Sequence, residues 1–255
     1  MKRRVYYYED ENIKNKQITA RYKFSLQFVK NKLVVDIGCG ARRGPYILSD
    51  IASKVVATDI SQEAIIYSAK EWLRNNLSYI TANVKFLPFK NDLFDCVISL
   101  EVIEHIDDYE SFLSEVKRVM KAEGVFIVST PNRPVISPGG ILSNPDHIRE
   151  FDLEEFRNIL NSHFSNFTLY GQKPSYKIME AENFLNHIYQ NLNRVPDLFR
   201  QLLPKILKRK ILKTFISFFA KIKALSDPNQ IIEEDFIFEE EGIEKARYFL
   251  AVCRK

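Results

Sequence analysis

The sequence predicts an α/β fold: a Rossmann-like, doubly wound, seven-stranded sheet with a helical insertion before its last strand. Short apolar runs recur through the first half of the chain, each with the length of one buried strand. Segments with apolar residues at helical spacing separate these runs, as right-handed crossovers between parallel strands require. The first run, at 33–37, enters a glycine-bearing turn of the kind that lets main-chain N–H groups approach a ligand.

Local patterns predict the individual elements. Ile18, Tyr22 and Leu26 lie at helical spacing before the first strand, and Ser61 and Asp108 are residue types that cap helix N-termini. The last strand is expected to be an antiparallel partner at the edge of a mostly parallel sheet. In chain order, the expected elements are a helix at 15–30, a strand at 33–37, a helix at 45–51, a strand at 54–59, a helix at 61–75, strands at 79–83 and 94–100, a helix at 109–121, a strand at 124–130, a helix at 153–161, and strands at 166–171 and 247–253.

The bulk properties describe one globular domain with an insertion. The chain has 255 residues, 45% of them hydrophobic, and its net charge of +4 is too small for a polycation built to bind nucleic acid. Cys39, Cys96 and Cys253 are far apart and have no metal-binding spacing, which favours free thiols in the cytoplasm. The basic N-terminus lacks the apolar core of a signal peptide, and no apolar run has the length of about 18 residues needed to span a membrane.

The domain boundaries follow from shifts in composition. Residues 1–14, which include Tyr6 to Tyr8, are expected to form an N-terminal arm that could close over a site. The core is expected at 15–181, a basic amphipathic helical insertion or lid at 182–226, and an acidic linker with the final strand at 227–255.

Residues at the ends of successive strands predict a cofactor pocket. Ligands of doubly wound sheets lie outside the carboxyl ends of the strands. Gly38 and Gly40 follow the first strand, and Asp59 ends the second about 20 residues later, where a ribose-binding acid is expected. The third glycine of the dinucleotide fingerprint is missing, which argues against NAD or FAD. The turn therefore predicts another nucleoside-containing cofactor.

Four segments together resemble one family. These are VVDIGCGARRGPYIL, VVATDIS, LPFKNDLFDCVISLEVIEHI and VFIVSTPN, and in this order and spacing they resemble class I S-adenosylmethionine-dependent methyltransferases over residues 20–172. The run NPDHIREFDLEEF at 144–156 resembles a subgroup of that family. The resemblance implies that S-adenosylmethionine is the cofactor.

The resemblance also implies a role for each strand end. Small departures from the family pattern, such as Arg42 and Arg43 in the first turn, leave this assignment intact. The two arginines could meet the carboxylate of the cofactor or face solvent, and the sequence favours solvent. The implied cofactor contacts are the turn residues Asp36, Gly38, Cys39 and Gly40 against the methionine part, Asp59 on the ribose hydroxyls, Ile60 on the adenine face, Asn83 and Val84 at the adenine edge, and Leu100 and Glu101 beside the methyl-donor sulfonium.

A second group of side chains, Glu101, Glu104, His105 and His147, is expected at the methyl-transfer end of the pocket. They could hold Mg or Mn and so lower the pKa of an acceptor hydroxyl. This arrangement resembles the metal site of small-RNA 3′-terminal ribose methyltransferases, which carry a similar Glu-x-x-Glu-His. Two alternatives remain open: His105 with Glu104 as a metal-free catalytic pair in which the imidazole is the base or orients the acceptor, and a purely structural role.

The segment 200–223 is basic and amphipathic. It carries eight Lys or Arg and no acid, whereas 227–244 carries eight acids and no Lys or Arg. The segment could pack on the core as a lid or form a homodimer contact, lie on an anionic membrane surface such as the inner membrane, or contact nucleic-acid phosphates, the outcome the sequence favours least.

The function that the sequence predicts is methyl transfer from S-adenosylmethionine to an oxygen of a sugar, glycan or lipid-linked small molecule. Three alternatives stay open: a metal-dependent RNA ribose 2′-O-methyltransferase, a quinone or lipid methyltransferase at the membrane surface, and an S-adenosylmethionine-binding protein without catalysis.

Overall fold

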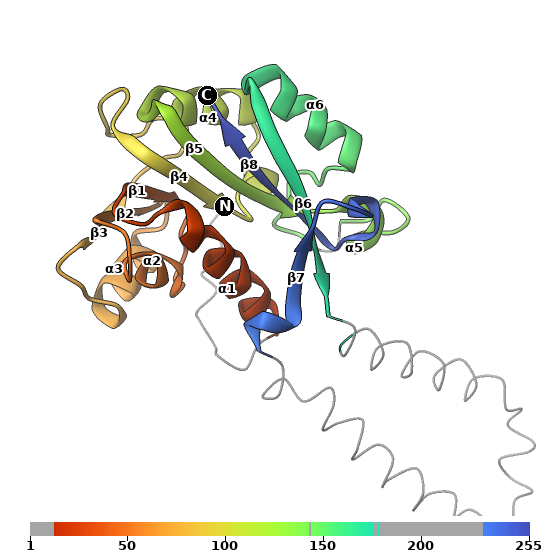
Figure 1. Ribbon diagram of the computed structural model, residues 1–255, viewed down its shortest axis with the longest axis horizontal. Helices are drawn as coiled ribbons and strands as arrows, with labels where there is room; N and C mark the ends of the chain where they lie inside the picture. The colour runs from red at the N-terminus through yellow and green to blue at the C-terminus, as the bar shows by residue number, and fades with distance from the viewer. Residues whose placement is uncertain (1–12, 143, 176–177, 179–231) are drawn as a thin grey trace, which may run out of the picture.

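The computed structural model describes residues 13–142, 144–175, 178 and 232–255 (Figure 1). The predicted insertion at 182–226 and nearly all of the predicted arm at 1–14 lie outside these residues, so both remain predictions. Among the described residues, no helix combines the length and the apolar character that a membrane span needs.

One mixed sheet of eight strands forms the centre of the fold, in the order β3-β2-β1-β4-β5-β8-β6-β7. The pairings among β1 to β5 are parallel, and β8 runs antiparallel between β5 and β6. The strands are β1 (Leu33–Ile37), β2 (Lys54–Asp59), β3 (Leu77–Thr81), β4 (Phe94–Leu100), β5 (Met120–Pro131), β6 (Asn166–Pro174), β7 (Phe236–Glu239) and β8 (Tyr248–Arg254).

Helices cover both faces of the sheet (Figure 1). Apolar residues of α1 (Ile13–Ser25), α2 (Gly44–Leu48) and α3 (Gln62–Glu71) pack in the core of one face. Those of α4 (Tyr109–Val119) and α6 (Leu153–His163) pack in the core of the other. The long loop after β5 contains the short α5 (Arg133–Ile136). The α/β doubly wound class predicted from the sequence is therefore confirmed.

The strand count and the edge position of the last strand were predicted wrongly. The sheet has eight strands because the predicted acidic linker contains β7, which pairs antiparallel with β6. Phe236 of β7 is buried, and the ring of Phe238 lies 4.6 Å from that of Phe24. These two aromatic residues stabilise a segment that was predicted to be a linker because it is rich in acids. The predicted insertion accordingly precedes β7 rather than the last strand.

The last strand lies inside the sheet rather than at its edge. From Phe249 to Cys253 every residue of β8 is buried, which is the pattern of a strand with neighbours on both sides and helices on both faces.

The chain leaves and re-enters the core at one place. The N–H of Ser175, just after β6, donates to the carbonyl oxygen of Asp235, just before β7, over 2.7 Å. Lys23 of α1 forms ion pairs with Glu233 and Glu234 in the same region, at 3.3 and 2.8 Å. The two ends of the segment between β6 and β7 are therefore held together against α1.

Substitution of Phe249 tests how much the interior strand β8 contributes to the free energy of unfolding. Its side chain is fully buried, and its ring stacks on that of Phe156 at 5.9 Å between centroids. Because Phe249→Ala leaves a large cavity, we expect the free energy of unfolding in urea to fall by about 3–5 kcal/mol. Phe86→Ala is the control, because Phe86 is 76% exposed, and its substitution should change the free energy of unfolding little. Equal effects of the two substitutions would contradict the assigned core.

Candidate functional site

The turn after β1 is built for close packing. Gly38 and Gly40 have φ values of +77° and +59°, which side chains of L-residues disfavour. A Cβ on Gly38 would lie 2.5 Å from a methyl carbon of Val102. The N–H groups of Gly38 and Cys39 both donate to the carbonyl oxygen of Thr58, at 2.7 and 2.9 Å. The turn is thereby fixed against β2. It follows β1, which pairs with β2 on one side and with β4 on the other, and ligands of such sheets usually bind at this point.

A cavity opens beside this turn. The space between its walls, counted together with its open mouth, is about 860 Å³. Its lining residues come from the carboxyl ends of β1, β2 and β4 and from the loops after β3 and α5. They are Gly38, Gly40, Ala41, Arg42, Asp59, Ile60, Ser61, Ala64, Val84, Leu100, Glu101, Val102, His105 and Asp146.

The structure brings most of the predicted cofactor residues to this cavity: Gly38, Gly40, Asp59, Ile60, Val84, Leu100 and Glu101. Asp36, Cys39 and Asn83 are not among the lining residues. Asp36 and Cys39 are buried behind the turn, and the side-chain oxygen of Asn83 accepts from the N–H of Lys85 at 3.0 Å. Direct contacts of these three with a cofactor therefore remain predictions.

Several lining residues were not predicted. Arg42, expected to face solvent, lies on the cavity wall, because the turn points residue 42 inward; Arg43 is exposed as expected. Ser61 is the N-cap of α3, directly after β2, and Ala64 lies in the first turn of that helix. Since helix N-termini follow strand ends in this fold, their position was available from the sequence.

Asp59 is held firmly in its orientation. One carboxylate oxygen accepts from the N–H of Gly40 and the other from the N–H of Ser61, each at 2.8 Å. A carboxylate oxygen can accept more than one hydrogen bond, so both oxygens can still bind hydroxyl groups. The geometry suits the predicted contact with two ribose hydroxyls.

Behind the turn, Asp36 is fully buried, and the hydroxyl of Tyr22 donates to its Oδ2 at 2.8 Å. Its Oδ1 has no hydrogen-bond partner among the described residues. Burial is the main cause that raises the pKa of Asp36 to about 7, which the hydrogen bond from Tyr22 partly opposes.

Glu101 occupies a strained position at the end of β4. Its φ is +59°, unusual for a residue with a side chain. Its N–H donates to the carbonyl oxygen and the hydroxyl of Ser129, both at 3.2 Å, and that hydroxyl donates to its Oε1 at 2.9 Å. Ser129 thus fixes both the backbone and the carboxylate of Glu101.

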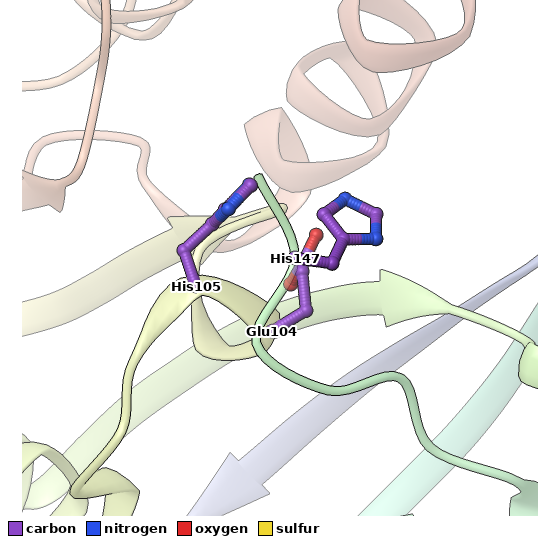
Figure 2. A group of neighbouring side chains, drawn as sticks. All are labelled: Glu104, His105 and His147. Atoms are coloured by element: carbon purple, nitrogen blue, oxygen red, sulfur yellow. The ribbon is translucent and has the colours of Figure 1, made fainter. Parts of the chain in front are cut away.

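Glu104, His105 and His147 come together beside this end of the cavity (Figure 2). Glu104 and His105 belong to a single 3-10 turn, Ile103–His105, and His147 comes from the loop that precedes α6. The carbonyl oxygen of Glu104 accepts from the N–H groups of Ile148 and Arg149, at 2.9 and 3.2 Å. These bonds hold the distant loop against the turn.

Each imidazole in this group has its Nδ1 engaged. Nδ1 of His105 lies 2.8 Å from the carbonyl oxygen of Asp146 and must donate, because a carbonyl only accepts. Nδ1 of His147 lies 2.6 Å from Oε1 of the buried Glu150. A neutral His105 therefore carries its lone pair on Nε2.

Glu104 is the buried acid of this group. Its side chain is fully buried, and its Oε2 accepts from the hydroxyl of Thr130 at 3.3 Å. Burial, and next the charge of Glu101, raise the pKa of Glu104 well above its usual range. One ligand-type atom from each of Glu104, His105 and His147 lies within 4.8 Å of the others, whereas Glu101, predicted as a fourth metal ligand, is outside this group.

Comparisons with known proteins bear on the same part of the chain. Residues 35–128 match the family model "Methyltransferase domain". A probable S-adenosylmethionine-dependent methyltransferase of Mycolicibacterium smegmatis is 34% identical over 130 residues, which cover 51% of this chain and 50% of that protein. A ubiquinone biosynthesis O-methyltransferase of Bartonella quintana is 32% identical over 111 residues, covering 43% and 45%.

The chain is therefore similar in sequence to S-adenosylmethionine-dependent methyltransferases over about half of its length. The predicted fold is confirmed, and the predicted enzyme class is the one for which these relatives are named. The chain spans about half the length of the curated relatives it matches. A solved S-adenosylmethionine-dependent methyltransferase of Thermotoga maritima has the same fold, with a TM-score of 0.58 and 16% identity over 95% of this chain and 94% of that one.

The raised pKa of Asp36 predicts a specific pH dependence of stability. The native pKa of about 7 exceeds the unfolded value of 3.8, so native Asp36 keeps its proton where the unfolded chain has lost it. Stability should therefore fall as pH rises from about 4 to about 7, by at most about 4 kcal/mol from this group.

Asp36→Asn isolates this effect. Urea denaturation at pH 5 and pH 8 should show the variant gaining stability relative to the wild type at the higher pH. If the stability difference between the two proteins is the same at both pH values, the raised pKa is wrong.

Proposed function

We propose that the protein transfers a methyl group from S-adenosylmethionine to a hydroxyl oxygen. The observation that carries this proposal is the cavity at the carboxyl ends of β1, β2 and β4, whose wall includes both the fixed carboxylate of Asp59 and His105. The ribose hydroxyls would bind Asp59, the adenine would lie against Ile60 and Val84, and the sulfonium would lie near Leu100 and Glu101.

The proposed proton acceptor is His105. Because the sulfonium is already an activated methyl donor, the protein has to align the acceptor oxygen and receive its proton. Nδ1–H of His105 donates to the carbonyl oxygen of Asp146, so the basic lone pair of the neutral ring is on Nε2. Glu104 is the proposed partner, because the positive charge that His105 gains would favour ionisation of this buried acid.

The acceptor that we propose is a small molecule with a sugar, glycan or lipid-linked hydroxyl. A quinone precursor is the second candidate, supported by the relatives named as ubiquinone biosynthesis O-methyltransferases. Both acceptors offer an oxygen nucleophile that loses a proton during transfer.

The geometry of Glu104, His105 and His147 supports a second proposal, that they hold a divalent cation which activates the acceptor hydroxyl. Both imidazoles have Nδ1 fixed by an oxygen, the arrangement typical of metal-binding histidines. Mn²⁺ fits two imidazoles and a carboxylate better than Mg²⁺, which prefers oxygen ligands. Ligand atoms about 2.1 Å from one ion are at most about 4.2 Å apart, so the group would have to close slightly around the ion.

The cofactor assignment is tested by Asp59→Ala. Loss of the charged hydrogen-bond acceptor should weaken S-adenosylmethionine binding, measured by calorimetry, by about 10- to 100-fold. Asp107→Ala, at an exposed acid that does not line the cavity, is the control and should leave the affinity unchanged. Unchanged affinity in Asp59→Ala would remove the basis for the pocket assignment.

The role of His105 is tested by labelled-methyl transfer to extracted glycans, lipids and RNA. His105→Ala should reduce transfer by about 10²- to 10⁴-fold while S-adenosylmethionine still binds. His163→Ala is the matched control, because it removes a histidine that lies outside the candidate site, on α6, where it pairs with Glu110. Binding of the cofactor by the wild type without transfer to any pool would favour a non-catalytic binding protein.

Chelation separates the two proposals for the histidines. If a cation is used, excess EDTA should abolish transfer, and Mn²⁺ should restore it. The electron paramagnetic resonance spectrum of Mn²⁺ should then show binding to the wild type that His147→Ala removes. Full turnover in excess EDTA would exclude the cation and leave His105 as the base.

A further inference from the structure

Helix α1 places an arginine inside the protein. Arg21 is 2% exposed, and a buried charge is costly unless partners compensate it. Its partners come from three distant parts of the chain. Nη1 donates to Oε1 of Gln172 on β6 at 2.6 Å, the guanidinium carbon lies 4.3 Å from the ring centre of Tyr248 on β8, and Nη2 lies 3.8 Å from Oε2 of Glu101.

Gln172 holds the guanidinium of Arg21 in place. Gln172 is itself buried, and its Nε2 donates to the carbonyl oxygen of Gln17, one turn earlier in α1, at 2.8 Å. Arg21 and Gln172 therefore tie α1 to β6 at two points. The guanidinium cannot move away from Glu101 without breaking these contacts.

Glu101 is consequently restrained on both carboxylate oxygens. Ser129 holds Oε1, and Arg21 is the one positively charged side chain that pairs with Oε2 among the described residues. Glu101 also lines the cofactor cavity and has a strained backbone. Strained residues persist where the surrounding structure determines their position, which is the case here.

We propose that Arg21 is a positioning residue that fixes the carboxylate of Glu101 at the methyl-donor end of the cavity. Through it, α1 and the strands β6 and β8 support from outside the cavity a residue that lines it. A lysine could not replace it fully, because the planar guanidinium contacts Gln172, Tyr248 and Glu101 at once, whereas an ammonium is a point charge. This inference rests on the proposed use of S-adenosylmethionine.

S-adenosylmethionine and S-adenosylhomocysteine probe this role without a known acceptor. The first has a positively charged sulfonium and the second a neutral thioether at the same position. A carboxylate held near the sulfur favours the charged ligand, so the ratio of the two dissociation constants, measured by calorimetry, reports where the carboxylate lies.

We expect Glu101→Gln to shift this ratio about 10-fold against S-adenosylmethionine, since a favourable charge interaction near the sulfur is lost. Arg21→Met should shift the ratio in the same direction by at least about threefold, and Arg21→Lys should shift it less. The double variant Arg21→Met, Glu101→Gln should match Glu101→Gln alone, because residues that act through one contact are not additive. Arg157→Met, at a half-buried arginine of α6 that pairs with Glu154, is the control.

A merely structural role for Arg21 would lower the thermal midpoint and leave the ratio unchanged. Simple charge screening would shift the ratio towards S-adenosylmethionine when Arg21 is removed. Either result, or additive effects in the double variant, overturns the inference.

If Arg21→Met does not fold, Gln172→Met tests the same restraint, with a smaller shift in the same direction expected and an unchanged ratio counting against the inference. Failure of the wild type to bind S-adenosylmethionine would instead overturn the proposed function.

Discussion

Gly38 has no side chain, and Val102 occupies the space where one would lie. This single close approach joins the end of β1 to the segment after β4, and the hydrogen bonds to Thr58 join it to β2. The cavity wall, the fixed carboxylate of Asp59 and the strained position of Glu101 all lie around this junction. A side chain at residue 38 would separate the end of β1 from the segment after β4, and the ends of β1, β2 and β4 supply most of the proposed cofactor contacts.

Local patterns were sufficient for the parallel half of the fold. β1, β2 and β4 have the predicted bounds, because continuous apolar runs bounded by turn residues have few other uses. The antiparallel half was less predictable, because pairing between strands distant in sequence leaves little local signal. Phe236 and Phe238 alternate within an acidic stretch, and the stretch is a strand because it pairs with β6 and packs its aromatic residues beside α1.

Boundaries were also affected by tertiary contacts. The predicted fifth strand began at Gly124, but β5 begins at Met120, which pairs with Phe94 before the register shifts.

For the candidate site, strand-end residues could be predicted and buried polar contacts could not. The positions of Gly38, Asp59 and Glu101 follow from topology alone. The approach of His147 to His105 was predicted from the loop that follows the fifth expected strand, and the structure adds Glu150 and Asp146 as the groups that orient the two rings. Arg21 lies on a helix whose apolar spacing gave no reason to expect a buried charge. Its partners Gln172 and Tyr248 are more than a hundred residues away, beyond any local pattern.

The bond between Ser175 and Asp235 has a consequence for how this fold can vary. Because the two ends of the intervening segment already touch, its length does not enter the geometry of the sheet, and each doubling of a loop adds only about 0.6 kcal/mol of closure entropy. Evolution can therefore lengthen, shorten or exchange that segment while β6, β7 and the cofactor cavity stay unchanged. The adjacent ion pairs of Lys23 hold the residues before β7 against α1, so α1 would keep its contact with this part of the chain in any such exchange.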